Sequence, residues 1–280
     1  MQTEHTNNPK SPKYYIKKYI DENKSALSGL TIIDIPAGTG ITTKLLLDIQ
    51  AKPEPFDLFP EYFKQENISC QKADLTDLLP ITAEYADMII CQEGIEHISD
   101  QAKLLKEFNR ILKPGGKLLI TTPSYSNLSS RYGYMMFESE KLYKHMPANE
   151  ADSIWMNSNK TNDIYFGHIF LTGIFKLRLL SRLAGFQLIE NRYTRLSKAS
   201  LFLLPIFYLP ILISSWMTYR KALSKTNGKH KNLYKELFQT NKSLKNLLNR
   251  HLFLVFEKSN ANDVMLPDTS TSTRDFENIT

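Results

Sequence analysis

The sequence predicts an α/β protein built on an open, doubly wound and mostly parallel sheet of seven strands. Three features favour this class. Short apolar segments of strand length alternate with amphipathic segments of helical period. A glycine turn follows the first predicted strand, and acidic residues stand at the ends of the next ones. A helical insertion, apolar and basic, is predicted before the last strand.

The individual elements follow from residue period and from boundary residues. The predicted strands are residues 30–35, 54–59, 68–74, 86–92, 117–123, 187–193 and 251–258, and the predicted helices are 41–50, 99–112 and 170–186. Ser99 or Asp100 is expected to cap the helix 99–112, and Lys-Pro-Gly-Gly at 113–116 to end it. Ligands of such sheets bind beyond the carboxyl ends of the strands, where the strand order changes direction.

Length and composition indicate one domain with insertions. A chain of 280 residues can bury a substantial core. Cys70 and Cys91 are the two cysteines, and they give neither a disulfide framework nor metal-ligand spacing, which favours a reducing compartment. The first residues are polar and lack the apolar core of a secretory signal, so a cytoplasmic location is expected. We expect a disordered arm at 1–12, a domain at 13–258 and a disordered tail at 259–280.

Two segments are too long for simple connections. Residues 124–168 are rich in aromatic residues and methionine, and they predict a lid over the acceptor. Residues 199–250 are the second segment. Between 191 and 250 there are 12 lysines and arginines against one acid, Glu236, whereas the rest of the chain has 23 basic and 28 acidic residues. An anionic membrane surface or a nucleic acid is the kind of partner that such a segment suits.

The basic segment contains an apolar run. Residues 201–217 form a charge-free run of 17 residues, below the roughly 20 that a comfortable membrane span needs. Pro205 and Pro210 interrupt it, and positive charge flanks both ends, which disfavours a simple span. A segment lying in the plane of an anionic membrane fits the pattern, and helices packed on the sheet are the alternative. Nucleic acid is disfavoured because the aromatic residues are not interleaved with the charges.

The loop after the first strand has the form of a ligand site. Residues 31–46 read TIIDIPAGTGITTKLL, a strand, a turn and a helix. Gly38 and Gly40 allow close backbone approach, and N–H groups at a helix N-terminus bind anionic or polar groups. Pro36 has no N–H to offer, but the amides of residues 37–40 are expected to stay available. A tight turn without a ligand is the alternative, because the third glycine of a dinucleotide-binding turn is missing.

Companion residues at the other strand ends favour a ligand. Asp57 ends the second strand at a spacing from which an acid can accept hydrogen bonds from ribose hydroxyls. The motifs KADLTDLLP, CQEGIEHISD and ILKPGGKLLITTP follow in order. This series resembles the class I S-adenosylmethionine-dependent methyltransferases, of the broad group that includes the ubiquinone-biosynthesis O-methyltransferases. The later segment GHIFLTGIFKLRLLSRLAGF is also similar to that family, so the resemblance covers residues 14–195 and the last strand.

The resemblance implies a Rossmann-like sheet, S-adenosyl-L-methionine as the cofactor, and a set of binding residues. Asp34, Pro36, Ala37, Gly38 and Gly40 would line the methionine end of the cofactor. Asp57 and Leu58 would border the ribose, Asp74 and Leu75 the adenine, and Gln92 and Glu93 the methyl-transfer site. Pro36 departs from the glycine that is more usual at its position. No metal site is expected.

His97 and His168 are the candidate catalytic bases, because histidine titrates near neutral pH. His97 stands in EGIEHISD, at the family's usual position, and His168 follows the long insertion at the rim of the acceptor pocket. A base is needed only if the acceptor loses a proton during the transfer. The alternative role of His97 is to organise its loop, and that of His168 is a cap or a loop hydrogen bond.

The sequence therefore predicts a methyltransferase that acts on an oxygen of a small or lipid-linked acceptor, peripheral to the cytoplasmic face of a membrane. Two alternatives stay open. A nicotinamide-dependent oxidoreductase is disfavoured by the missing glycine and by the lack of a Tyr-x-x-x-Lys pair near the fifth strand. A membrane-associated adaptor without catalysis would need none of Asp34, Gly38, Gly40 and Asp57.

Overall fold

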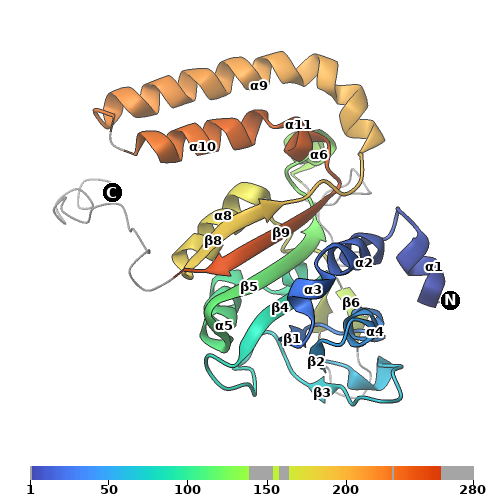
Figure 1. The fold of residues 1–280 in the computed structure, drawn as a ribbon. Helices are drawn as coiled ribbons and strands as arrows, with labels where there is room; N and C mark the ends of the chain where they lie inside the picture. The colour runs from blue at the N-terminus through green and yellow to red at the C-terminus, as the bar shows by residue number, and fades with distance from the viewer. Residues whose placement is uncertain (1, 139–153, 158–163, 229, 260–280) are drawn as a thin grey trace.

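A single sheet forms the centre of the molecule. The computed structural model describes residues 2–138, 154–157, 164–228 and 230–259. Within these residues, seven strands form this sheet in the order β3-β2-β1-β4-β5-β9-β8 (Figure 1). The strands are β1 (Thr31–Asp34), β2 (Lys52–Asp57), β3 (Gln71–Lys72), β4 (Ala86–Gln92), β5 (Leu112–Pro123), β8 (Phe186–Asn191) and β9 (His251–Lys258). The first five pair in parallel, and β9 is antiparallel to both β5 and β8. The predicted α/β class and doubly wound, mostly parallel sheet are confirmed.

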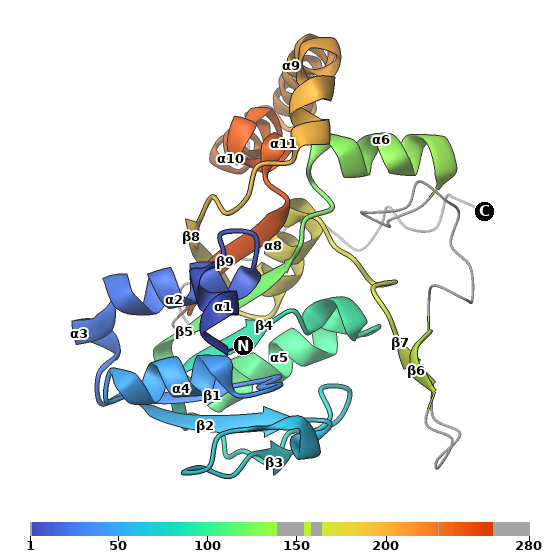
Figure 2. The ribbon, with the colours of Figure 1, turned by 90° about the vertical axis from the view of Figure 1, so that its right-hand side faces the viewer.

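Helices cover both faces of the sheet (Figure 2). One face carries α2 (Pro12–Glu22), α3 (Lys24–Leu27) and α4 (Ile41–Asp48), and the other carries α5 (Gln101–Ile111) and α8 (Ile174–Leu183). Neighbouring residues of β4 serve the two cores, because successive strand residues point to opposite faces. Ile90 packs with Ile20 of α2, whereas Ile89 packs with Phe108 and Leu177 of the opposite layer. The strand order reverses between β1 and β4, which puts the loops after these two strands at the switch point.

Three element predictions need correction. Residues 2–7, expected in a disordered arm, form the short helix α1 (Gln2–Asn7). The Lys-Pro-Gly-Gly segment does not separate the helix from the strand, because β5 already begins at Leu112, which pairs with Ala86 ahead of a register shift. The third strand is limited to Gln71–Lys72. Asp100 is the residue that caps α5, with its side chain accepting from the Lys103 amide at 2.9 Å.

The long insertion after β5 is described in part. It begins with α6 (Leu128–Phe137) and contains the two-stranded pair β6 (Ile154–Asn157) and β7 (Ile164–Phe166). The remaining residues of the predicted lid, 139–153 and 158–163, lie outside the described part of the chain. Two short 3₁₀ helices, η1 (Pro60–Tyr62) and η2 (Ile95–His97), follow β2 and β4.

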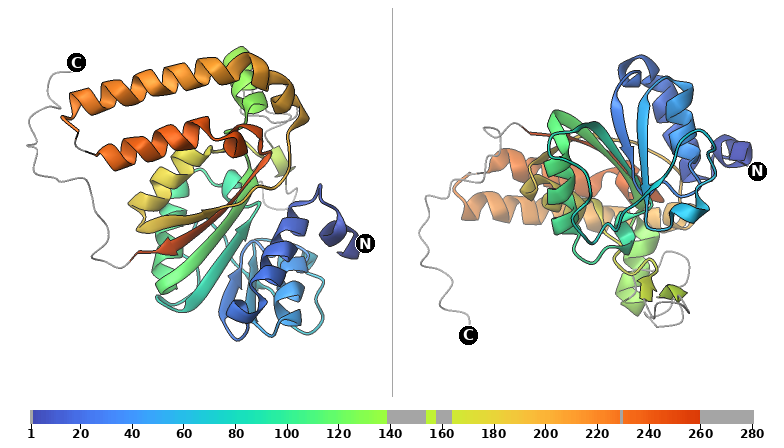
Figure 3. Two further views of the ribbon diagram at one scale, coloured as in Figure 1. Left: turned by 45° about the horizontal axis from the view of Figure 1, so that its top comes forward. Right: turned by 90° about the horizontal axis from the view of Figure 1, so that it is seen from below.

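The basic insertion forms a helical hairpin beyond the β8–β9 end of the sheet (Figure 3). It consists of α9 (Lys198–Lys225), α10 (Lys231–Lys242) and the short α11 (Leu244–Leu248). Among the described residues, α9 is the helix long and apolar enough to cross a membrane by length and composition. Its most apolar 18-residue window has a mean hydropathy of 1.8 and is 6% buried. α9 continues through Pro205 and Pro210 with one side facing solvent, so most of its apolar window is not covered by the sheet.

Polar contacts hold this hairpin to the rest of the molecule. Arg178 of α8, 6% exposed, pairs with Glu236 of α10 at 2.5 Å. The Ser200 hydroxyl donates to the side chain of Asn127, the N-cap of α6, at 2.9 Å, and both residues are buried. Because buried polar groups lose their water, such paired groups fix one docking geometry for α9.

Candidate active site

The loop between β1 and α4 has the backbone geometry that its two glycines predict. Gly38 and Gly40 have φ values of 54° and 81°, in the left-handed region. A Cβ on Gly40 would lie 2.7 Å from the ring of Phe63, so Gly40 is fixed by packing as well. A Cβ on Gly38 would meet nothing within 4 Å, so this residue borders open space. The Ile35–Pro36 peptide that leads into the turn is cis.

The amides of Ala37, Gly38 and Gly40 bind the protein itself, which corrects the expectation for three of the four residues 37–40. The Ala37 amide donates to the carbonyl of Phe56 at 2.9 Å, and the Gly40 amide to the carbonyl of Ala37 at 3.0 Å. The Gly38 amide donates to the Asp57 carboxylate at 2.7 Å. The reason is that the ends of β1 and β2 lie side by side, so the loop amides complete their hydrogen bonds on β2.

The acids that end β2 and β3 organise their own turns. Asp57 is 8% exposed, and its second carboxylate oxygen accepts from the Phe59 amide at 2.9 Å. Asp74 accepts from the amide and hydroxyl of Thr76 at 2.8 and 2.7 Å. Leu58 and Leu75, which follow these acids, are half-buried. The assigned contacts of these four residues with ribose and adenine stay predictions.

A buried polar triad joins β1, β4 and α2. Asp34 is fully buried at the end of β1 and accepts from the Thr43 hydroxyl at 2.6 Å. Gln92, 4% exposed at the end of β4, accepts from the Lys13 ammonium at 2.6 Å and from the Thr42 hydroxyl at 3.1 Å. Burial raises the pKa of Asp34 to about 6, and the charge of Lys13 opposes the shift. Burial lowers the pKa of Lys13, against the charge of Asp34.

The triad contains polar atoms that the protein leaves unpaired. Asp34 Oδ1 and Gln92 Nε2 have no hydrogen-bond partner within the described residues. Such atoms cost free energy when buried, so in a native structure they call for an explanation. A charged acceptor, an amide donor and an ammonium group together fit the amino-acid end of a ligand such as S-adenosylmethionine. Sequence patterns offered no reason to select Lys13, because a lysine in a helix usually faces solvent.

Glu93 is held in a strained conformation at the end of β4. Its φ is 51°, which is uncommon for a residue with a side chain and is characteristic of functional sites. One carboxylate oxygen accepts from the Thr121 hydroxyl at 3.0 Å. The other lies 3.5 Å from Nε2 of His251, a residue that sequence reasoning did not select. Glu93 therefore connects β4, β5 and β9 at the carboxyl edge of the sheet.

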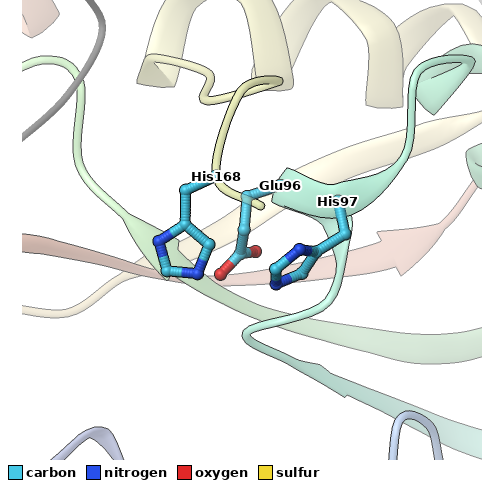
Figure 4. Close-up of side chains that lie close together, drawn as sticks. All are labelled: Glu96, His97 and His168. Atoms are coloured by element: carbon cyan, nitrogen blue, oxygen red, sulfur yellow. The ribbon is translucent and has the colours of Figure 1, made fainter. Parts of the chain in front are cut away.

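The two candidate bases lie together (Figure 4). The rings of His97 and His168 have centroids 4.8 Å apart in an edge-on arrangement. Glu96 is fully buried beside them and accepts from the Thr122 hydroxyl at 3.0 Å, while its Oε1 has no partner among the described residues. Gln101 holds the segment of Glu96 and His97 next to the segment of His168, because its Nε2 donates to the carbonyls of Ile95 and Phe170.

This cluster has the chemistry of a proton-transfer or cation site. Burial lowers the pKa of His168, and the neighbouring His97 adds to the shift, so the neutral imidazole is favoured at neutral pH. Burial raises the pKa of Glu96 well above its ordinary value, with Glu93 as the next cause. One ligand atom from each of Glu96, His97 and His168 lies within 4.8 Å of the others, so the same groups could hold a divalent cation.

Known proteins match both the sequence and the fold. A family model described as "Methyltransferase domain" matches residues 10–191, more than half of the chain. The chain belongs to this methyltransferase family. Its membership confirms the class I S-adenosylmethionine-dependent family that the motifs resemble, and S-adenosylmethionine is the cosubstrate that membership implies. The oxidoreductase alternative loses its basis.

The curated relatives share less than half of this methyltransferase. The ubiquinone biosynthesis O-methyltransferase of Acinetobacter baylyi is 25% identical over 144 residues, which cover 48% of this chain and 60% of the relative. The enzyme of that name from Nitrosomonas europaea is 28% identical over 138 residues, covering 46% and 58%. The chain thus spans about three-fifths of the length of these relatives. A SAM dependent methyltransferase from Archaeoglobus fulgidus has a TM-score of 0.51 at 12% identity, covering 89% of this chain and 96% of that one, which supports the fold.

Proposed function

We propose that this protein transfers the methyl group of S-adenosylmethionine to an oxygen atom of a small or lipid-linked acceptor, at the cytoplasmic surface of a membrane. The observation that carries the proposal is the polar triad of Lys13, Asp34 and Gln92. Its unpaired buried atoms lie at the carboxyl ends of β1 and β4, where sheets of this topology bind their ligands.

The residues present fit the cosubstrate. The Lys13 ammonium suits the carboxylate of the methionine moiety, and Asp34 suits its ammonium group. Asp57 suits the ribose hydroxyls, and Asp74 with Leu75 the adenine. When bound, S-adenosylmethionine supplies a methyl group on a positively charged sulfur. Since such a transfer needs little covalent help, the main task of these residues is to hold the reactants in line.

His168 is the base of this proposal. The hydroxyl of the acceptor must lose its proton as the oxygen takes the methyl group, and a neutral imidazole can accept that proton. His168 is favoured over His97 because it is the more exposed of the two rings. The ring of His97 lies edge-on to that of His168, so in this proposal His97 is a positioning residue that orients the imidazole of His168.

The membrane part of the proposal is supported by the outer face of α9. Phe202, Ile206, Leu209, Ile213 and Trp216 recur at intervals of three or four residues, which places them on one side of the helix, and all five are exposed by 51% or more. Lysines and arginines precede and follow the helix. An apolar helix face flanked by cations is the pattern of an element that lies in an anionic membrane surface.

Titration calorimetry with S-adenosylhomocysteine tests the methyltransferase assignment. We expect saturable binding by the full chain and a loss of at least about tenfold in affinity for Asp57→Asn, since one acceptor oxygen becomes a donor and the negative charge is lost. Asp77→Asn, at an exposed acid outside the site, is the matched control. Absence of binding at high micromolar ligand would overturn the assignment.

Vesicle flotation tests the membrane assignment. The full chain is expected to float with phosphatidylglycerol vesicles and much less with phosphatidylcholine vesicles. The variant Ile206→Asp/Ile213→Asp changes exposed positions and should stay in the bottom fraction, with its circular dichroism spectrum unchanged. Flotation of this variant equal to that of the wild type would refute membrane binding through α9.

A further inference from the structure

A small depression lies beside the predicted methyl-transfer residues, between the N-terminal segment and the sheet, where β5 ends and β9 begins. Lys10 and Tyr15 line it from one side, Thr121 and His251 from the sheet, and Arg195 from the linker that leads into α9. The lining thus brings two permanent cations and a histidine to one place. Neither the cofactor residues nor the proposed base belong to it.

The backbone that carries Arg195 is held rigidly. Asn249 is fully buried, and its side-chain oxygen accepts from the amides of Thr194 and Arg195 at 3.1 and 3.2 Å. Its side-chain nitrogen donates to the carbonyl of Arg192 at 3.2 Å. One buried asparagine therefore fixes the whole turn of the linker, so the position of Arg195 is set by the fold.

The cations of this depression lack acidic partners. No ion pair of Lys10 or Arg195 is formed within the described part of the chain, whereas Arg192, three residues earlier, pairs with both Glu22 and Glu190. The guanidinium of Arg195 reaches only the carbonyl of Lys10, at 3.5 Å. An anion would supply the oppositely charged partner that both side chains lack, and the planar guanidinium suits phosphate or carboxylate oxygens.

Glu93 connects the depression with the predicted methyl-transfer site. Thr121 and His251 both line the depression, and both contact the carboxylate of Glu93. Glu93 is thus the acidic group on the inner side, and it faces His251. A molecule anchored at Arg195 would therefore lie one side chain away from the predicted methyl-transfer site.

We propose that the methyl acceptor is an anion, and that Lys10 and Arg195, with His251, bind its phosphate or carboxylate group. This inference rests on the proposed function for the identity of the bound molecule as the acceptor. The anion site is separate from Lys13, which belongs to the cofactor end. Arg195 lies three residues before the start of α9, so the site adjoins the segment that is proposed to bind the membrane.

Calorimetric titration of the full chain with pyrophosphate tests the site, with and without saturating S-adenosylhomocysteine. We expect Arg195→Gln to weaken pyrophosphate binding about tenfold or more, and Lys10→Gln to weaken it further in the double variant. Arg182→Gln, at an arginine that is 51% exposed on α8, is the control and should bind as the wild type does. Equal affinity in all variants, or no saturable binding by the wild type, would overturn the proposal.

Further arms of the experiment separate its possible failures. Arg195→Gln should bind S-adenosylhomocysteine as tightly as the wild type does. If neither the wild type nor the variants bind S-adenosylhomocysteine, the proposed function fails, and the anion site is not affected by that result. Dodecyl phosphate in neutral micelles is compared with pyrophosphate. If the wild type binds dodecyl phosphate more tightly than pyrophosphate, and Arg195→Gln loses this binding, the result supports a lipid-borne anion. Equal affinity for the two compounds supports a soluble anion.

Discussion

Pro36 and Gly94 touch across the two loops that frame the site. A Cβ on Gly94 would lie 2.6 Å from Cδ of Pro36 and 3.4 Å from Sγ of Cys91. The loop after β1 therefore packs on the loop after β4 at a point where no side chain fits. Pro36 thus has a packing partner on the loop after β4.

Gly94→Ala should destabilise the protein. The φ of Gly94 is −127°, which any residue can adopt, so the effect comes from overpacking alone. Such an insertion costs about 1–3 kcal/mol in the free energy of unfolding, measured by urea denaturation. In the double variant with Pro36→Ala most of this cost should disappear, because the pyrrolidine ring causes the clash. Additive effects of the two substitutions would contradict the contact.

Asp34 should make the protein less stable as the pH rises from about 4 to 6. Its pKa is about 6 in the folded state against a model value of 3.8, so in this window the folded state keeps a proton that the unfolded state has lost. The difference amounts to roughly 3 kcal/mol at most. In urea unfolding at several pH values, Asp34→Asn should gain stability relative to the wild type between pH 4 and 6 and hold that gain at pH 8. A constant difference between the two proteins would show that Asp34 titrates normally.

Residues in continuous apolar segments were the most predictable part of the fold. The predicted bounds 86–92 and 251–258 coincide with those of β4 and β9, because both strands are buried on both faces and end at polar residues. Helix α9 was harder, since Pro205 and Pro210 indicate interruption. The helix continues through them because packing on α6 and α10 supplies stability that local propensity does not show.

Some residues of the candidate site could also be predicted from the sequence, and others could not. Asp34 and Asp57 end β1 and β2, and Gly38 lies in the loop after β1, so motif and spacing could select them, whereas Gln92 was selected through the family resemblance. Lys13 reaches Gln92 only when α2 docks on the sheet, and Arg195 meets His251 only when β9 pairs beside β5. No local pattern records such long-range contacts, and their roles follow from the folded structure alone.

Lys13→Met should weaken the binding of S-adenosylhomocysteine. The substitution keeps an unbranched side chain of similar length but removes the cation that donates to Gln92, so a ligand carboxylate would lose its ionic partner. We expect a loss of about tenfold to a hundredfold in affinity by calorimetry. Lys18→Met, at a lysine of the same helix whose side chain is 59% exposed, is the control. An unchanged affinity in Lys13→Met would place the carboxylate elsewhere.

His168→Gln should lower the rate of methyl transfer while leaving S-adenosylhomocysteine binding intact. The loss of a general base costs about 10²- to 10⁴-fold in kcat, and a lipid extract of cells that lack the protein can serve as the source of acceptor. Because burial holds the pKa of His168 below 6.5, the wild-type rate should fall only on the acidic side of that value, and this limb should vanish in the variant. His230→Gln, at an exposed histidine of the hairpin, is the control.

A chelator should leave the wild-type rate unchanged. A rate that is lost in EDTA and restored by Mg²⁺ would instead assign Glu96, His97 and His168 to a bound cation.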